Sequence, residues 1–213
     1  MTKAQRLVER IRAHNRERAI AAHRMLNPPL IFGEPATIVR DSFNRPNAAS
    51  LGNAETGQAY VDYGGALQII SGQCAWTSSG ADVAQRLVDS GSSDGRIRVS
   101  MMSNTQFVEF IFRGVDVNNW LLFGLVVAGA NQDVEIWQKV ANVYTRIGQE
   151  AVDLTAGQYY TFECVYQGSS ISLYRNGALS ISITETDNQN GTLIGPRMRA
   201  ANERIDWYEV YTR

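Results

Sequence analysis

The spacing of hydrophobic positions changes near residue 40. Residues 2–26 contain no Gly or Pro, and their apolar side chains recur three and four positions apart, which predicts a helix with Thr2 as its N-cap. Polar residues interrupt the apolar stripe, so we expect the helix to order only against a partner. Asn27-Pro28-Pro29 ends it, because proline cannot donate the helical hydrogen bond.

From Asp41 onward, apolar residues alternate with polar ones. Residues 96–101 and 108–113 both have this period of two, which predicts antiparallel strands with one buried and one solvated face. Residues 120–127 are apolar on both faces, so that strand is either central and covered or lies at an interface.

Turn signals divide this region into hairpins. Asn176-Gly177 separates the two alternating runs of 170–184, and Ala141-Asn142 is predicted as a second tight turn. Residues 205–211 form a predicted closing strand. Without intervening helical patterns, the fold class predicted is an all-β antiparallel jelly-roll β-sandwich preceded by an α-helical arm.

The predicted organisation has three parts, and charge divides unevenly among them. They are a basic helical arm (1–26), an extended connector (27–40) and the jelly roll (41–213). The arm has seven basic and two acidic residues, a local charge of +5, so the rest of a chain of net charge −1 carries −6. This asymmetry favours an arm that docks on an acidic partner, although a merely solvated helix has the same composition. The candidate docking residues are Arg6, Leu7, Arg10, Ile11, Arg18 and Met25.

Composition narrows the class of protein. The chain has 213 residues, enough for one substantial core, and no apolar run long enough for a membrane helix. The N-terminus is charged throughout and lacks the apolar segment of a secretory signal, so we expect folding in a reducing cytoplasm. The two cysteines are too few for a disulfide framework, and Cys164 is predicted to be a buried free thiol.

Several motifs of the β region resemble a known family. Its opening resembles the entry to the concanavalin A-like, laminin G-like jelly rolls of tailed-bacteriophage virion proteins. The motif residues are Asp41, Phe43, Arg45, Leu51, Gly52, Thr56 and Gly57. VEIWQKV, VYTRIG, the run from LTAGQYY to ALSIS and the terminal IDWYEV are similar to that family's later hairpins and closing strand. Tyr60 stands where the family often has Trp.

This resemblance covers 41–213 and implies a structural or carbohydrate-binding module displayed on a capsid or tail. It leads us to expect a virion component, assembled in the host cytoplasm, that docks on other virion proteins through 1–40. We also expect the chain to form a homo-oligomer, of which a trimer is one form, and to contact host-surface glycans. Nucleic acid is not an expected partner. A lectin-like module unrelated to virions is the alternative.

Candidate catalytic groups are few. The only histidines, His14 and His23, lie in the arm, which excludes a Ser-His-Asp or Cys-His site within the β region. Asp133 and Glu135 share one strand face and are the best carboxylate pair for glycoside hydrolysis, a remote alternative. Glycosidases of this fold carry two glutamates flanking an aspartate on one strand, whereas this strand offers one glutamate. We therefore expect no enzymatic activity.

The hairpin around Ala141-Asn142 offers a binding hypothesis. Its predicted register pairs Ile136 with Ile147 on the apolar face. The opposite face then combines aromatic and charged side chains, which suits stacking on a sugar ring and hydrogen bonding to its hydroxyls. Cross-strand stabilisation or a subunit contact explains the same residues. They are Glu135, Trp137, Lys139, Tyr144 and Arg146.

Two oxygen-rich segments, 89–94 and 187–190, are candidates for binding calcium. Neither has the ligand spacing of a known site, and Asn, Asp and Gly are the residues that turns require. The sequence therefore predicts no metal and no cofactor.

Overall fold

The computed structural model describes residues 35–76, 83–128 and 131–212, and the predicted helical arm with its docking residues lies outside them. Alternating sequences produce strands throughout, and the described residues contain no helix. The strands are β1 (Thr37–Asp41), β2 (Val61–Asp62), β3 (Leu67–Ile70), β4 (Gln73–Trp76), β5 (Ala84–Asp89), β6 (Gly95–Met102), β7 (Phe107–Asp116), β8 (Asn119–Ala128), β9 (Asn131–Val140), β10 (Val143–Ala151), β11 (Tyr159–Gln167), β12 (Ser170–Arg175), β13 (Ala178–Thr184), β14 (Leu193–Met198) and β15 (Arg204–Tyr211).

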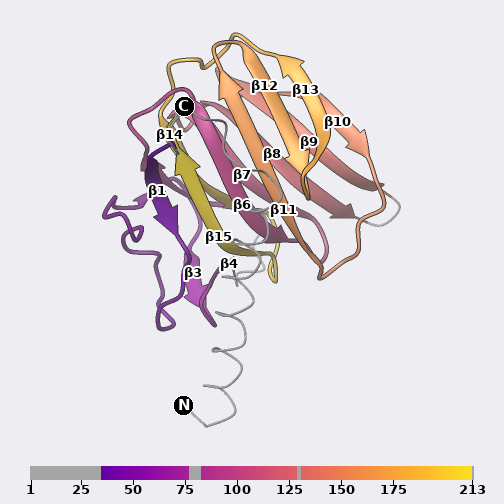
Figure 1. The fold of residues 1–213 in the computed structure, drawn as a ribbon. Coiled ribbons are helices and arrows are strands. Elements are labelled where there is room, and N and C mark those ends of the chain that lie inside the picture. The colour runs from indigo at the N-terminus through magenta and orange to yellow at the C-terminus, as the bar shows by residue number, and fades with distance from the viewer. Residues whose placement is uncertain (1–34, 77–82, 129–130, 213) are drawn as a thin grey trace. The chain divides into compact units, whose positions relative to one another are not determined.

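These strands form two antiparallel sheets stacked as a jelly-roll-like sandwich (Figure 1). Sheet I has the order β13-β12-β11-β6-β15-β4-β3, with β1 also paired to β15, and sheet II has the order β10-β9-β8-β7-β14-β5-β2. The all-β sandwich predicted from the alternation is thus confirmed. Within the described part of the chain, no helix is long and apolar enough to cross a membrane.

One main core fills the space between the sheets. It contains the inward-facing residues of 97–101 and 108–112, as their alternation predicts, together with Cys74 and Cys164, both buried and free. Strand β8 lies between β7 and β9, and residues 120–127 are buried, so the central, covered alternative is the one observed. A second, smaller cluster lies on the other face of sheet II, and its members are Leu87, Ile111, Trp120 and Leu122.

The solvated faces predicted for β6 and β7 are wrong. Arg98 and Glu109 lie on those faces and are 5% and 1% exposed. Arg98 is covered because its guanidinium lies over the Trp207 ring and 3.6 Å from Glu163. Glu109 is covered because β14, far along the chain, places Arg197 directly beside it.

Both predicted tight turns are confirmed, and each hairpin also contains a bulge. Ala141 and Asn142 have φ of 48° and 68°, and Asn176-Gly177 likewise has positive φ at both residues. The bulge in β10 pairs Ile136 with Gly148, so the predicted pairing of Ile136 with Ile147 is wrong.

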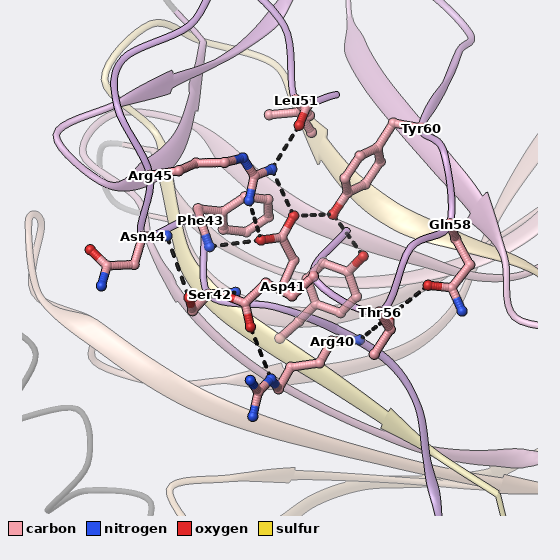
Figure 2. Close-up of polar contacts among 12 residues, drawn as sticks. Arg40, Asp41, Ser42, Phe43, Asn44, Arg45, Leu51, Thr56, Gln58 and Tyr60 are labelled. Atoms are coloured by element: carbon pink, nitrogen blue, oxygen red, sulfur yellow. Dashed lines mark hydrogen bonds and ion pairs between the residues drawn. The ribbon is translucent and has the colours of Figure 1, made fainter. Parts of the chain in front are cut away.

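A buried hydrogen-bond network closes the start of the sandwich (Figure 2). The Asp41 carboxylate is fully buried and accepts hydrogen bonds from the Phe43 amide, at 2.8 Å, and from both terminal nitrogens of Arg45, at 2.6 and 2.9 Å. It also accepts the Tyr60 hydroxyl at 3.0 Å, and that hydroxyl lies 2.7 Å from the hydroxyl of Tyr208 on β15. The opening motif therefore joins β1 to the closing strand.

Residues of the predicted connector contribute to this junction. Strand β1 begins at Thr37 and pairs with β15 up to Asp41, so the sandwich starts before Asp41. Asp41 holds the pKa of Arg45 above its ordinary value, chiefly through their hydrogen bond, whereas burial acts in the other direction. The motif that carries the family resemblance thus has a structural role here.

Candidate functional site

The five residues predicted to form a binding face lie together on β9 and β10. Tyr144 is paired with Lys139 and Arg146 with Trp137, as the turn position predicts. Glu135 lies two residues before Trp137 on the same face. This is the face of sheet II turned away from the main core, because Val134 and Ile136, which alternate with these residues along β9, belong to that core.

Glu135 holds the middle of this face together. Its Oε2 accepts the Trp137 indole N–H at 2.7 Å, and its Oε1 accepts the Arg146 guanidinium at 2.8 Å. The same guanidinium lies 5.9 Å from the centre of the Trp137 ring. One carboxylate therefore fixes both the indole and the cation that stacks on it.

A lysine and two aromatic rings form the end of the face near the β9–β10 turn. Lys139 donates its Nζ to the Val117 carbonyl at 2.9 Å and lies 5.1 Å from the Tyr144 ring and 5.5 Å from the Trp120 ring. The Trp120 and Tyr144 rings meet edge to face, with centroids 5.5 Å apart. These contacts support the cross-strand stabilisation that the sequence left open as an alternative.

Three charged residues that the sequence did not single out extend the face across the sheet. Glu109 on β7 forms an ion pair with Arg197 on β14, and its Oε2 also lies 3.4 Å from the Nε of Arg199. Arg197 reaches 5.3 Å from the Trp120 ring, and Arg199 lies 4.7 Å over the Phe107 ring.

Gly124 separates the two glutamates of this face. It is paired with Glu109 on one side and Glu135 on the other. A Cβ at this position would lie 2.8 Å from Cγ of Glu109 and 2.5 Å from the carbonyl oxygen of Val108. A glycine is thus required here for Glu109 Cγ and the Val108 carbonyl to lie this close to β8.

Exposure distinguishes the groups that a ligand can reach from those that support them. Tyr144 is 44% exposed, and the side chains of Arg146 and Arg199 are 42% and 32% exposed, with Trp137 half-buried. Glu135 and Lys139 are both buried. Ligand contacts would therefore come mainly from the first four side chains.

The buried Arg197 and the partly buried Arg199 lie in an unfavourable environment for their charge. Burial lowers the pKa of Arg197, and the neighbouring charge of Arg199 lowers it further. Burial also lowers the pKa of Arg199, whereas Tyr144 and Glu135 oppose that shift. The Nε atoms of both arginines and Oε1 of Glu109 are buried without a hydrogen-bond partner.

The site has no arrangement typical of a metal centre. No group of three His, Cys, Asp or Glu side chains that could hold a metal ion is found in the described ranges. Asp187 instead accepts a hydrogen bond from Gln138, and Asp94 binds Arg113 and the Gly168 amide.

Comparison with known proteins identifies the fold. No protein-family model matches the chain, and no curated protein matches its sequence. Among solved structures, the Bacillus licheniformis β-glucanase has a TM-score of 0.55 at 16% identity and covers 85% of this chain and 100% of its own. The VIP36 exoplasmic/lumenal domain, in its Ca2+/Man-bound form, has a TM-score of 0.56 at 8% identity, covering 75% of this chain and 85% of its own.

A third similar structure is a carbohydrate-binding module. CBM66 from Bacillus subtilis has a TM-score of 0.52 at 12% identity and covers 72% of this chain and 92% of its own. At these identities the likeness concerns the fold alone. The described β region therefore has the jelly-roll sandwich fold that concanavalin A-like carbohydrate-binding modules and β-glucanases also have.

Proposed function

We propose that this protein binds glycans on the outer face of sheet II, centred on β9 and β10. The observation that carries the proposal is the Glu135, Trp137 and Arg146 arrangement, in which one buried carboxylate orients an indole and a partly exposed guanidinium. An oriented aromatic ring can stack on the apolar face of a sugar, and neighbouring guanidinium donors can bind its hydroxyls.

The similar structures support this proposal without deciding it. Their names concern a carbohydrate-binding module, a glucanase and a mannose-bound domain, on a fold that hosts several functions. The site of this chain supplies the independent argument, because aromatic and charged side chains meet on one face of the sandwich.

We propose binding without hydrolysis. Glycoside hydrolysis needs one carboxyl group that donates a proton and a second that acts as nucleophile or base. Of the candidate pair Asp133 and Glu135, Glu135 accepts hydrogen bonds from Trp137 and Arg146, so its carboxylate serves as an acceptor of fixed donors. Glu109, another carboxylate of this face, accepts a hydrogen bond from Arg197 in the same way. Incubation with a bound glycan should release no new reducing ends.

The proposed setting is a bacteriophage particle, with the arm attached to capsid or tail and the jelly roll displayed. The family resemblance of 41–213 and the +5 charge of 1–26 support this part. Deletion of 1–26 should abolish incorporation into particles while the purified chain keeps its unfolding transition. Normal incorporation would contradict the proposed anchoring.

The glycan proposal is tested with a glycan array and three full-length proteins. The parent should retain a defined subset of glycans, and Trp137→Ala should bind them at least tenfold more weakly, or about 1.4 kcal/mol. Tyr159→Ala removes an exposed aromatic from sheet I and serves as the matched control. Equal binding by Trp137→Ala and the parent would refute the proposal, provided that both unfold at similar urea concentrations.

A further inference from the structure

The proposed glycan site holds more positive than negative charge. We call Glu109, Glu135, Arg146, Arg197 and Arg199 the charged strip. Three guanidiniums there face two carboxylates, and Lys139 and Asp133, on the same face of β9, add one charge of each sign. The surplus is local, since the chain beyond residue 26 carries −6.

The positive charges lie closest together around the Glu109 carboxylate. Arg197 donates to its Oε2, and Nε of Arg199 lies 3.4 Å from the same oxygen. Two cations therefore share one carboxylate oxygen, while the buried Nε atoms of both arginines lack a hydrogen-bond partner. Removing guanidinium charge from water is costly unless anions compensate it, and the lowered pKa values of both arginines agree with incomplete compensation.

The two accessible arginines are held in defined orientations. The Arg146 guanidinium lies 5.9 Å from the centre of the Trp137 ring, and that of Arg199 lies 4.7 Å from the centre of the Phe107 ring. Arg146 uses NH1 for Glu135, which leaves other guanidinium N–H groups for a ligand. A guanidinium fixed on an aromatic ring can bind a carboxylate or sulfate through two parallel hydrogen bonds.

We propose that the glycan bound at this site is acidic, with a carboxylate or sulfate group recognised by Arg199 and Arg146. This inference rests on the proposed glycan-binding function. The anionic group would offset the surplus charge of the strip, while Trp137 stacks on the sugar ring. A neutral glycan would leave the surplus uncompensated, so the site should discriminate against it.

The test uses an array that presents uronate-containing and sulfated glycans beside neutral glycans of the same backbones. The full-length parent should retain acidic glycans at least tenfold more strongly than their neutral counterparts, and added salt should weaken this retention. Uronate and sulfate spots identify the anionic group. Arg199→Gln and Arg146→Gln should each lose most of the preference for acidic glycans.

Arg40→Gln is the matched control, because Arg40 is exposed on β1 of sheet I and forms a surface ion pair with Glu55. It should bind as the parent does. Retention of neutral glycans that depends on Trp137 but not on Arg199 or Arg146 would overturn the acidic preference and leave the proposed function intact. Retention of no glycan would overturn both.

Discussion

Replacement of the buried carboxylate that joins β1 to β15 should destabilise the whole sandwich. In Asp41→Asn the carboxylate loses its charge while Arg45 keeps its own. With the asparagine oxygen at Oδ1, the amide nitrogen replaces Oδ2 and cannot accept the hydrogen bonds that this oxygen accepts from Arg45 and from the Tyr60 hydroxyl. The perturbation therefore removes one partner of a largely buried ion pair and leaves donors unsatisfied.

The expected cost follows from the burial of the two partners. Breaking a buried ion pair by removing one member costs about 3–5 kcal/mol. The Arg45 side chain is 28% exposed and also donates to the Leu51 carbonyl at 2.7 Å, so water and this carbonyl compensate part of the loss. We therefore expect the lower end, about 3 kcal/mol. For a domain of this size, that lowers Tm by roughly 6–12 °C.

Urea unfolding followed by circular dichroism measures this loss directly. The midpoint should fall with little change in slope, because the folded and unfolded surfaces stay similar. Arg40→Gln provides the comparison, since it removes the exposed ion pair between Arg40 and Glu55 and should cost no more than about 1 kcal/mol. A loss below about 1 kcal/mol for Asp41→Asn would refute the idea that this network stabilises the fold.

Three further predictions concern packing, thiols and pH. Gly124→Ala should lower the free energy of unfolding by about 1–3 kcal/mol in urea titrations, because the new Cβ would lie 2.5 Å from the Val108 carbonyl oxygen. Leu179→Ala, at a 57% exposed site, should change this free energy little, and equal effects of the two substitutions would contradict the packing argument. Both thiols should resist a thiol reagent in the folded chain and react after unfolding, because they are buried and their pKa is raised; rapid labelling without denaturant would be inconsistent with this burial. Stability should fall as pH rises above about 9–10, because groups whose folded pKa is raised, chiefly by burial, stay protonated while the unfolded chain loses their protons. The lowered pKa values of Arg197 and Arg199 act in the opposite direction but are outnumbered, and a urea midpoint that is the same at pH 8 and pH 11 would contradict this prediction. The groups with raised pKa are Cys74, Cys164, Tyr60, Tyr166, Tyr208 and Tyr211.

Local features of the site were predictable from the sequence, because a hairpin is specified by its turn and its alternation. Ala141-Asn142 places Trp137 opposite Arg146, and the structure has this pairing. The bulge was not predictable, since nothing in the period of two indicates the extra residue that pairs Gly148 with Ile136.

Contacts between distant strands could not be derived in the same way. Glu109 alternates with core residues and resembles a solvated position, yet Arg197, which lies 88 residues later, covers it. The position of β14 between β7 and β5 depends on the topology of the whole sandwich. The repeated positions of Arg197 and Arg199 on one strand face were the available signal, but their partner strand was not identifiable from the sequence.

The location of the bound glycan can be measured directly by hydrogen–deuterium exchange of the full-length protein with and without a glycan retained on the array. We expect slower exchange in peptides from 131–151, which contain β9 and β10, and unchanged exchange in β11, β12 and β13 of sheet I. Protection confined to sheet I, with none in 131–151, would contradict the assignment of the glycan site to the outer face of sheet II.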